Sequence, residues 1–565
     1  MRDQNKNVEC ERLYKQLYPR LSDYIDYHAD SRPDDVAIIE YDTETEVTWA
    51  EFYQSTKAFA AHLLELGLEK GDVIATTLPL LKEHVYLMYA CYRIGVIIAP
   101  LDLRLKTKEI DRCLSLIRPK AYFFLGKTEV TDFRLMVAEI MDNHPYVENW
   151  VQFDFFPHLI IQGAISIREF AAGVKKSYIR ALLTGSVRDA QAKVGKRDPC
   201  LIIFTTGSTG FPKPALLCHE NILMQNIGIK VAFEIDSDDT MCVNLPPSHV
   251  GCVTEQLATT IFAGGICVIL RIFDAEKTLD AIERYRVTAF GEIPALFNLQ
   301  WRLPNYSRFD LSSLRFALYG GQAVSRAFLE KLSEMAPKFG TGLGLTETAG
   351  FVTYTPLDGT VDDILASVGF DSPLCPVSIR APMKEDGYAG AEKENREIGE
   401  ICFSGDQIFL GYLNDEENTK KTISTDGYCY TGDLGYYDEK GLHFAGRSKF
   451  VIKPKGYQVF PTEVEDFIEH KFPERILAVA CVGVPHDIYS EAIMAFIEVE
   501  PGTQLEISEL KSAVREMAAY KRPSHFEIVG PEEIPLNRVA KTDYMELKKM
   551  AHKIVHKLRS ENKWD

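Results

Sequence analysis

Residues 205–213 combine four hydroxyl side chains and two glycines with a closing lysine, directly after the apolar residues 201–204. The apolar stretch predicts a buried strand. Glycine lets a backbone approach a ligand closely with its N–H groups, hydroxyls donate to phosphate oxygens, and lysine adds positive charge. The run therefore predicts a polyphosphate-binding loop at a strand end. An ordinary turn rich in Ser, Thr and Gly is the alternative that composition leaves open.

This run differs from the common ATP-binding loop, which requires Gly-x-x-x-x-Gly-Lys-Ser/Thr. Counting from Gly207, Pro212 stands at the position of the second glycine and Pro214 at that of the hydroxyl. The run therefore contains the residue types of a phosphate-binding loop, but at a different spacing.

Helix and strand signals alternate from about residue 48 onward. Residues 48–51 form a capping box, and apolar residues then follow at helical spacing up to Gly67, which can end the helix. Strand signals at 73–75 and 96–99 flank a helical signal at 83–93. This alternation predicts an α/β fold with layered, parallel sheets.

The length of 565 residues predicts more than one domain. A turn-rich segment precedes residues 446–449, and the remainder of the chain has its own pattern, with strand signals at 478–484 and 492–499. We expect a large N-terminal region of several α/β subdomains at 1–447 and a small, mobile C-terminal α+β domain at 450–565, joined by a hinge near Lys449. A short pivot suits an enzyme that rearranges between steps.

The net charge of −18 disfavours nucleic-acid binding, which needs a basic face. The twelve cysteines contain no Cys-x-x-Cys pair, so zinc and dithiol chemistry have little support. The first residues are polar, unlike a secretory leader, and Glu255 interrupts the longest apolar stretch, at 252–273. We therefore expect a cytoplasmic protein without a membrane span.

The run at 205–213 resembles the phosphate loop of the adenylate-forming superfamily, which contains acyl-CoA synthetases, peptide-synthetase adenylation domains and luciferases. Further segments that match this superfamily follow in the same order, at residues 320–322, 342–347, 396–412, 430–433, 446–457 and 535–541. The resemblance extends from about residue 30 to about residue 550. We assign the segment at 396–412 to folding.

The resemblance implies a role for each matching residue. Glu347 would hold Mg²⁺, Thr346 would contact the α-phosphate, and Asp433 would accept hydrogen bonds from the ribose. The implied ATP-binding residues are Thr205, Thr206, Gly207, Ser208, Thr209, Gly210, Lys213, Gly321, Gln322, Leu343, Asp433 and Arg447. The implied catalytic residues are Lys541, Thr346, Glu347 and His249.

The acid and the thiol acceptor are assigned in the same way. Between Leu245 and Gly251 there is no acidic residue to hold a substrate amine, which favours a simple carboxylic acid over an amino acid. The implied acyl-pocket residues are His249, Val250, Gly251, Cys252 and Gly320. The implied coenzyme A contacts are Lys455, Gly456 and Tyr457.

Four positions depart from the superfamily pattern. Pro214 replaces a usual glycine, Leu343 a usual aromatic residue, Phe450 a usual acidic residue, and the pair 539–540 a usual Ser-Gly or Thr-Gly. Proline removes an N–H group and restricts the residue before it, so we expect an altered end of the phosphate loop. Leu343 at the usual aromatic position leaves open the affinity for the nucleotide and the preference for its base.

The resemblance implies an AMP-forming acyl-CoA synthetase that uses ATP, Mg²⁺ and coenzyme A. A medium-chain aliphatic, alicyclic or aromatic acid suits the small residues of the acyl pocket, and a homo-oligomer is compatible with the sequence. Three alternatives stay open: a ligase that loads a carrier protein in trans, a luciferase-like oxygenase, and a nucleotide-binding regulator without catalysis.

Overall fold

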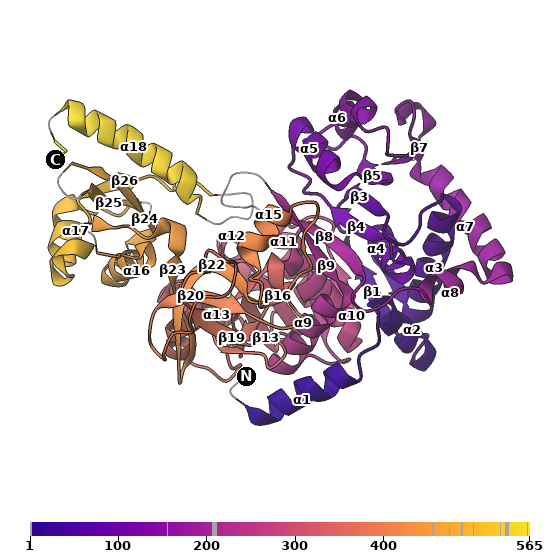
Figure 1. Ribbon diagram of the computed structural model, residues 1–565, viewed down its shortest axis with the longest axis horizontal. Helices are drawn as coiled ribbons and strands as arrows, with labels where there is room; N and C mark the ends of the chain where they lie inside the picture. The colour runs from indigo at the N-terminus through magenta and orange to yellow at the C-terminus, as the bar shows by residue number, and fades with distance from the viewer. Residues whose placement is uncertain are drawn as a thin grey trace.

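The computed structural model describes residues 3–564 except 155, 206–211, 455–456, 474, 488–489, 501, 532, 537–541 and 562. Figure 1 shows a large region, coloured from indigo to orange, and a C-terminal unit that stands to one side of it. No helix in the described part of the chain is both long enough and apolar enough to cross a bilayer.

The first sheet of the large region is mostly parallel. Helices α3 (Trp49–Glu65) and α4 (Lys82–Ile94) cover one face, and α5 (Thr107–Ile117) and α6 (Phe133–Ile140) cover the other. The strand order is β21 (Gly411–Tyr412), β9 (Lys213–Cys218), β8 (Pro199–Thr205), β4 (Ile97–Pro100), β3 (Val73–Thr77), β5 (Ala121–Leu125), β6 (Asn149–Phe153) and β7 (Ile165–Ser166).

The predicted start and end of the first long helix are confirmed. The Thr48 side chain accepts a hydrogen bond from the Glu51 amide, and the Glu51 carboxylate accepts one from the Thr48 amide. After the helix, Gly67 has a φ of 81°, which is the left-handed conformation that glycine adopts readily. The capping box therefore fixes where α3 begins, before its apolar face packs on the sheet.

The second sheet lies against the first through a shared core. Its strand order is β14 (Phe339–Gly340), β13 (Phe316–Tyr319), β12 (Ala289–Glu292), β10 (Thr240–Val243), β11 (Ile266–Ile269), β1 (Val36–Glu40) and β2 (Thr45–Thr48). Its outer face is covered by α11 (Ala275–Arg284), α12 (Pro294–Trp301) and α13 (Arg326–Met335).

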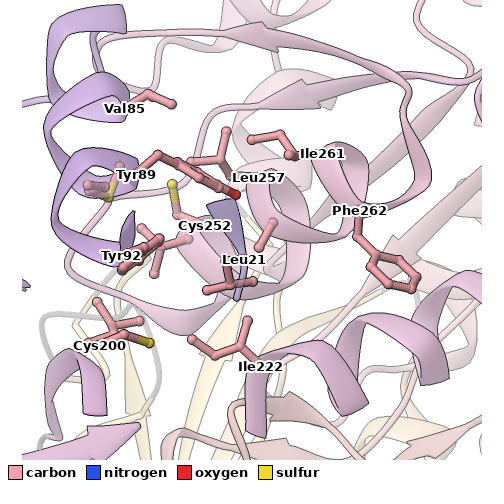
Figure 2. Packing of buried hydrophobic residues seen from close by; sticks show 14 of the residues in the cluster. Leu21, Val85, Tyr89, Tyr92, Cys200, Ile222, Cys252, Leu257, Ile261 and Phe262 are labelled. Carbon is pink, nitrogen blue, oxygen red and sulfur yellow. The ribbon is translucent and has the colours of Figure 1, made fainter. Parts of the chain in front are cut away.

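The shared core is built from α4, from α9 (His219–Ala232), and from a π-helical turn η4 (Gly251–Ala258) that continues into α10 (Thr259–Ala263). Figure 2 shows Tyr89 and Tyr92 of α4 facing Cys252 and Leu257 of η4. Because these side chains are removed from water, the packing fixes η4 against both sheets and sets which of its residues face outward.

An antiparallel sheet completes the large region, in the order β19 (Val377–Arg380), β20 (Gly399–Phe403), β22 (Cys429–Asp438) and β23 (Gly441–Arg447). The segment 396–412, which the sequence assigned to folding, supplies β20 to this sheet and β21 to the first sheet. A short turn η7 (Ser448–Phe450) then leads into the C-terminal unit.

The C-terminal unit places helices on both faces of a small sheet. Strands β24 (Ile476–His486), β25 (Ser490–Val499) and β26 (His525–Val529) lie in that order, so the two strands predicted here are confirmed. Helices α16 (Pro461–Lys471) and α17 (Ile507–Ala513) pack on one face, and α18 (Tyr544–Ser560) packs on the other.

Helix α16 buries the carboxyl group of Glu465 beneath this sheet. That group accepts hydrogen bonds from the Cys481 amide at 2.7 Å and from the Tyr544 hydroxyl at 3.0 Å. Burial raises the pKa of Glu465 to about 8. Burial, together with the neighbouring Asp466 carboxylate, likewise raises the pKa of Glu469 to about 7.

We expect the stability of the C-terminal unit to fall as pH rises toward 8. The native Glu465 keeps its proton up to about pH 8, whereas the unfolded residue loses it near about pH 4.3, so the native state binds more protons between these values. The stabilisation is complete below the unfolded pKa and is lost as pH rises through the native one. Glu465→Gln should flatten this slope in thermal unfolding, and Glu516→Gln, an exposed control, should not. Identical slopes for Glu465→Gln and the wild type would contradict the assignment.

Candidate active site

A cleft of about 3580 Å³ lies between the large region and the C-terminal unit, with residues of both in its walls. The carboxyl ends of β10, β12 and β13 contribute Asn244, Glu292 and Gly320 to one wall. In α/β sheets, ligands bind at this edge of the strands.

The described ends of the predicted phosphate loop line this cleft. Thr205 ends β8 and Lys213 begins β9, and the two are cross-strand partners. The Lys213 ammonium lies over the Tyr412 ring, 5.0 Å from its centroid. The other predicted loop residues lie outside the described part of the chain: Thr206, Gly207, Ser208, Thr209 and Gly210.

Tyr412 also holds Glu347, a contact that the sequence analysis missed. The Tyr412 hydroxyl donates to Glu347 Oε1 at 2.6 Å, and burial together with this carboxylate raises the pKa of the tyrosine. Strand β21 carries Tyr412 and pairs with β9, beside Lys213. Thr346 and Glu347 lie in the cleft wall on a short turn, η6 (Thr346–Thr348). One tyrosine therefore contacts both the lysine of the phosphate loop and the predicted metal ligand.

The predicted ribose contacts are paired with each other. Asp433 and Arg447 are cross-strand partners in β22 and β23, and Arg447 Nε lies 2.9 Å from Asp433 Oδ1. The Asp433 side chain is buried, whereas that of Arg447 is largely accessible from the cleft. Gly321, Gln322 and Leu343 line the same cleft.

The predicted hinge residue Lys449 also reaches the cleft. Partial desolvation in the cleft and the neighbouring Arg447 together lower the pKa of Lys449 to about 8, against the opposing effect of Asp433 and Asp543. Its neighbour Phe450 packs on Tyr544 of α18, with ring centroids 4.8 Å apart. The aromatic residue that departs from the superfamily pattern thus contacts the first turn of α18, where an acidic side chain would lose this packing.

The predicted acyl pocket is brought together with one exception. His249, Val250, Gly251 and Gly320 line the cleft, and His249 Nδ1 accepts a hydrogen bond from the Gly251 amide at 3.1 Å. A side chain at Gly320 would come within 2.9 Å of the Phe351 ring, so glycine keeps this wall open. Cys252 is the exception: it is fully buried and faces Tyr89 in the shared core (Figure 2). The turn of η4 directs this side chain away from the cleft, so its prediction as a pocket residue is wrong.

Glu292 adds a carboxyl group to this wall that the sequence analysis did not identify. Asn244 donates to its Oε1, and Gln300 donates to its Oε2 at 2.7 Å. Burial raises the pKa of Glu292 to about 8. Burial therefore favours the neutral form of this carboxyl group, which reduces its repulsion of an anionic acid.

Among the predicted coenzyme A residues, the structure describes only Tyr457, and this residue does not meet the other site residues in this arrangement. Tyr457 is exposed, stacks on Tyr520 with ring centroids 4.5 Å apart, and lies outside the cleft. Lys455, Gly456 and the predicted catalytic Lys541 lie outside the described residues. Thr542, which follows Lys541 in sequence, lines the cleft.

Comparison with known families identifies the chain. The model of the AMP-binding enzyme family matches residues 25–413, which is more than half of the sequence. The chain belongs to the AMP-binding enzyme family. The model of the AMP-binding enzyme C-terminal domain matches residues 463–541. The superfamily predicted from the sequence is thereby confirmed.

Relatives match this AMP-binding enzyme over nearly its full length. Indoleacetate–CoA ligase of Aromatoleum aromaticum is 28% identical over 93% of this chain and 98% of its own length. Long-chain-fatty-acid–CoA ligase of Bacillus subtilis is 27% identical over 90% of each chain. The names of these two relatives specify different acids, but both specify CoA.

Solved structures share the fold. The anthranilate CoA ligase AuaEII in complex with anthranoyl-AMP has a TM-score of 0.81, with 22% identity over 96% of this chain and 99% of that one. ATP-bound MatB from Rhodopseudomonas palustris has a TM-score of 0.77, with 23% identity over 94% of this chain and 99% of that one. The predicted fold, a large α/β region with a small C-terminal domain, is confirmed.

Proposed function

We propose that this AMP-binding enzyme is an AMP-forming acyl-CoA synthetase. It would convert a carboxylic acid and ATP to acyl-AMP and pyrophosphate, and then use the thiol of coenzyme A to release acyl-CoA and AMP. The supporting observation is that one cleft receives the described ends of the phosphate loop, Glu347, and the Asp433–Arg447 pair. The coenzyme A ligase names of the relatives support the choice of acceptor.

In the first half-reaction, two anions must approach each other. The acid's carboxylate attacks the α-phosphate, so the barrier is largely electrostatic and is lowered by positioned positive charge. Lys213 and Arg447 would supply cations, since both side chains line the cleft. Asp433 would orient the ribose, and Thr346 the α-phosphate.

A single carboxylate at the proposed metal position fits Mg²⁺. Magnesium usually binds one or two carboxylates and completes its coordination with substrate phosphates and water. Among the described residues there is no group of three or more His, Cys, Asp or Glu that could hold a metal ion alone. Glu347, oriented by Tyr412, would hold Mg²⁺ together with the nucleotide, and the ion would neutralise phosphate charge.

We expect Tyr412→Phe to weaken the apparent Mg²⁺ affinity by about 10- to 100-fold, the usual effect of removing a group that orients a metal ligand. The ring that contacts Lys213 is retained, so the change isolates the hydroxyl. Mg²⁺ titrations of acid-dependent ATP–pyrophosphate exchange measure the shift. Tyr437→Phe is the control, because that hydroxyl donates to Asp371 at 2.7 Å away from the cleft. An unchanged Mg²⁺ midpoint in Tyr412→Phe would contradict the proposal that the Tyr412 hydroxyl orients Glu347.

The second half-reaction requires a different arrangement. We propose that residues 450–565 rotate against residues 1–447 about Lys449, which would withdraw Lys541 and bring Lys455, Gly456 and Tyr457 to the acyl-AMP. The position of Tyr457 on Tyr520, outside the cleft, supports the need for such a movement. The twelve buried, unbridged cysteines support a reducing compartment such as the cytoplasm.

The acid is proposed to be aromatic, alicyclic or medium-chain aliphatic, because small residues and a neutral Glu292 form its wall. Pyrophosphate release with a panel of such acids, with and without coenzyme A, tests the proposal. We expect acid-dependent exchange without coenzyme A and a thioester product with it. A thioester formed only on a supplied carrier protein would instead support a carrier ligase. Oxygen consumption with light emission would support an oxygenase. The absence of exchange with any acid would support a regulator.

A further inference from the structure

Residues 167–197 concentrate positive charge in an otherwise acidic chain. This segment contains eight Lys or Arg residues and two acidic ones, whereas the whole chain has a net charge of −18. It forms α7 (Ile167–Thr184), α8 (Ser186–Gln191) and the turn before β8. Figure 1 shows α7 at the end of the large region farthest from the C-terminal unit.

One face of α7 is buried in the large region. The Phe170 ring packs against Phe59 of α3 and Phe123 of β5, with ring centroids 5.6 Å and 5.1 Å apart. Val174 and Ala181 are buried on the same side. These contacts hold the helix firmly, so the direction of its opposite face is fixed.

The opposite face exposes large aliphatic side chains. Ile179 is 65% exposed, Leu182 63% and Leu183 85%, which places three such residues within five positions. At about 100° per residue, the order around the helix is Leu182, Lys175, Ile179, Leu183, Lys176. The aliphatic residues and two exposed lysines therefore share one outward strip.

We propose that this strip, the outward face of α7, docks the enzyme on an anionic lipid surface. A helix that lies in the plane of a membrane buries an apolar strip at the headgroup boundary, while Lys and Arg extend toward the lipid phosphates. Arg180, Arg188, Lys196 and Arg197 of the segment are paired with carboxylates. Lys175 and Lys176 of the strip therefore supply the positive charge that complements anionic lipid. A symmetric contact between two copies would bring the lysines of both strips together, so a second copy is disfavoured.

Vesicle co-sedimentation of the purified full-length enzyme tests the proposal. We expect the enzyme to pellet with vesicles of equal parts phosphatidylcholine and phosphatidylglycerol, to stay in solution with phosphatidylcholine alone, and to be released by high salt. Each lysine near an anionic surface strengthens binding by about fivefold, so Lys175→Glu/Lys176→Glu should weaken the partition by about 25-fold or more.

Two further variants separate the strip from general charge. Ile179→Ser/Leu183→Ser keeps the charge and should also release the enzyme from the vesicles. Lys553→Glu/Lys557→Glu makes the same charge change on exposed positions of α18 and should leave binding unchanged. Circular dichroism and adenylation activity confirm that each variant is folded.

Three outcomes would overturn the proposal. They are no pelleting with the anionic vesicles, equal loss in the α18 control, and a dimer that the α7 variants dissociate while vesicle binding is absent. Light scattering of the same samples measures the last of these, and it would assign the strip to contact between copies.

Discussion

Replacement of Lys541 by alanine is expected to slow acid-dependent ATP–pyrophosphate exchange by about 10²–10³-fold, the usual loss when one preorganised donor is removed from a reacting centre. Its ammonium is proposed to neutralise charge as the carboxylate meets the α-phosphate. The residue lies outside the described part of the chain, and its role is proposed from the resemblance of residues 535–541 and from the position of Thr542 in the cleft wall.

The test separates the two half-reactions. Conversion of supplied acyl-AMP to the thioester should proceed nearly as in the wild type, because Lys541 is proposed to leave the site before that step. Lys553→Ala, on the exposed side of α18, serves as the control. An equal loss in both half-reactions would contradict the proposed rotation of the C-terminal unit.

The second large effect is expected at Glu347. Glu347→Gln should lower kcat/KM for adenylation by about 10²–10³-fold, since it removes the proposed anionic ligand for Mg²⁺. The amide oxygen can still accept the hydrogen bond from Tyr412, so the change removes charge while it keeps the shape. Part of the loss should be recovered at high Mg²⁺, and a titration of the exchange rate measures this.

A carboxylate elsewhere in the cleft wall provides the matched control. Glu330 lies on α13 at the exposed side of the wall, and Glu330→Gln should leave both the rate and the Mg²⁺ midpoint unchanged. If Glu347→Gln lost activity with an unaltered Mg²⁺ midpoint, the proposed role of Glu347 as a metal ligand would be contradicted.

Local patterns predicted much of the fold. The capping box at Thr48 and the apolar runs that become β3, β4 and β8 specify their elements through neighbouring residues, so short windows of sequence are sufficient. The strand order could not be predicted in this way. Strand β21, for example, pairs with β9 although about 200 residues separate them in the sequence.

The same distinction applies to the candidate site. Motifs located Thr205, Lys213 and Glu347, because their residue types and order are characteristic. Cys252 was assigned to the pocket from its position in the chain, but the π-helical turn η4 determines the direction of its side chain. The contact of Tyr412 with Glu347 spans 65 positions and has no local signature.

The pairing of Asp433 with Arg447 has a consequence for the nucleotide. Arg447 Nε lies 2.9 Å from Oδ1 of the carboxylate that we propose as the acceptor for a sugar hydroxyl. Binding of ATP in the proposed site would then exchange one partner of this carboxylate for another, and the net gain in binding free energy would be smaller than the new hydrogen bonds alone would give. Under the proposed function, the arginine would pair again with the carboxylate after AMP leaves, so that the buried charge would keep a partner between turnovers.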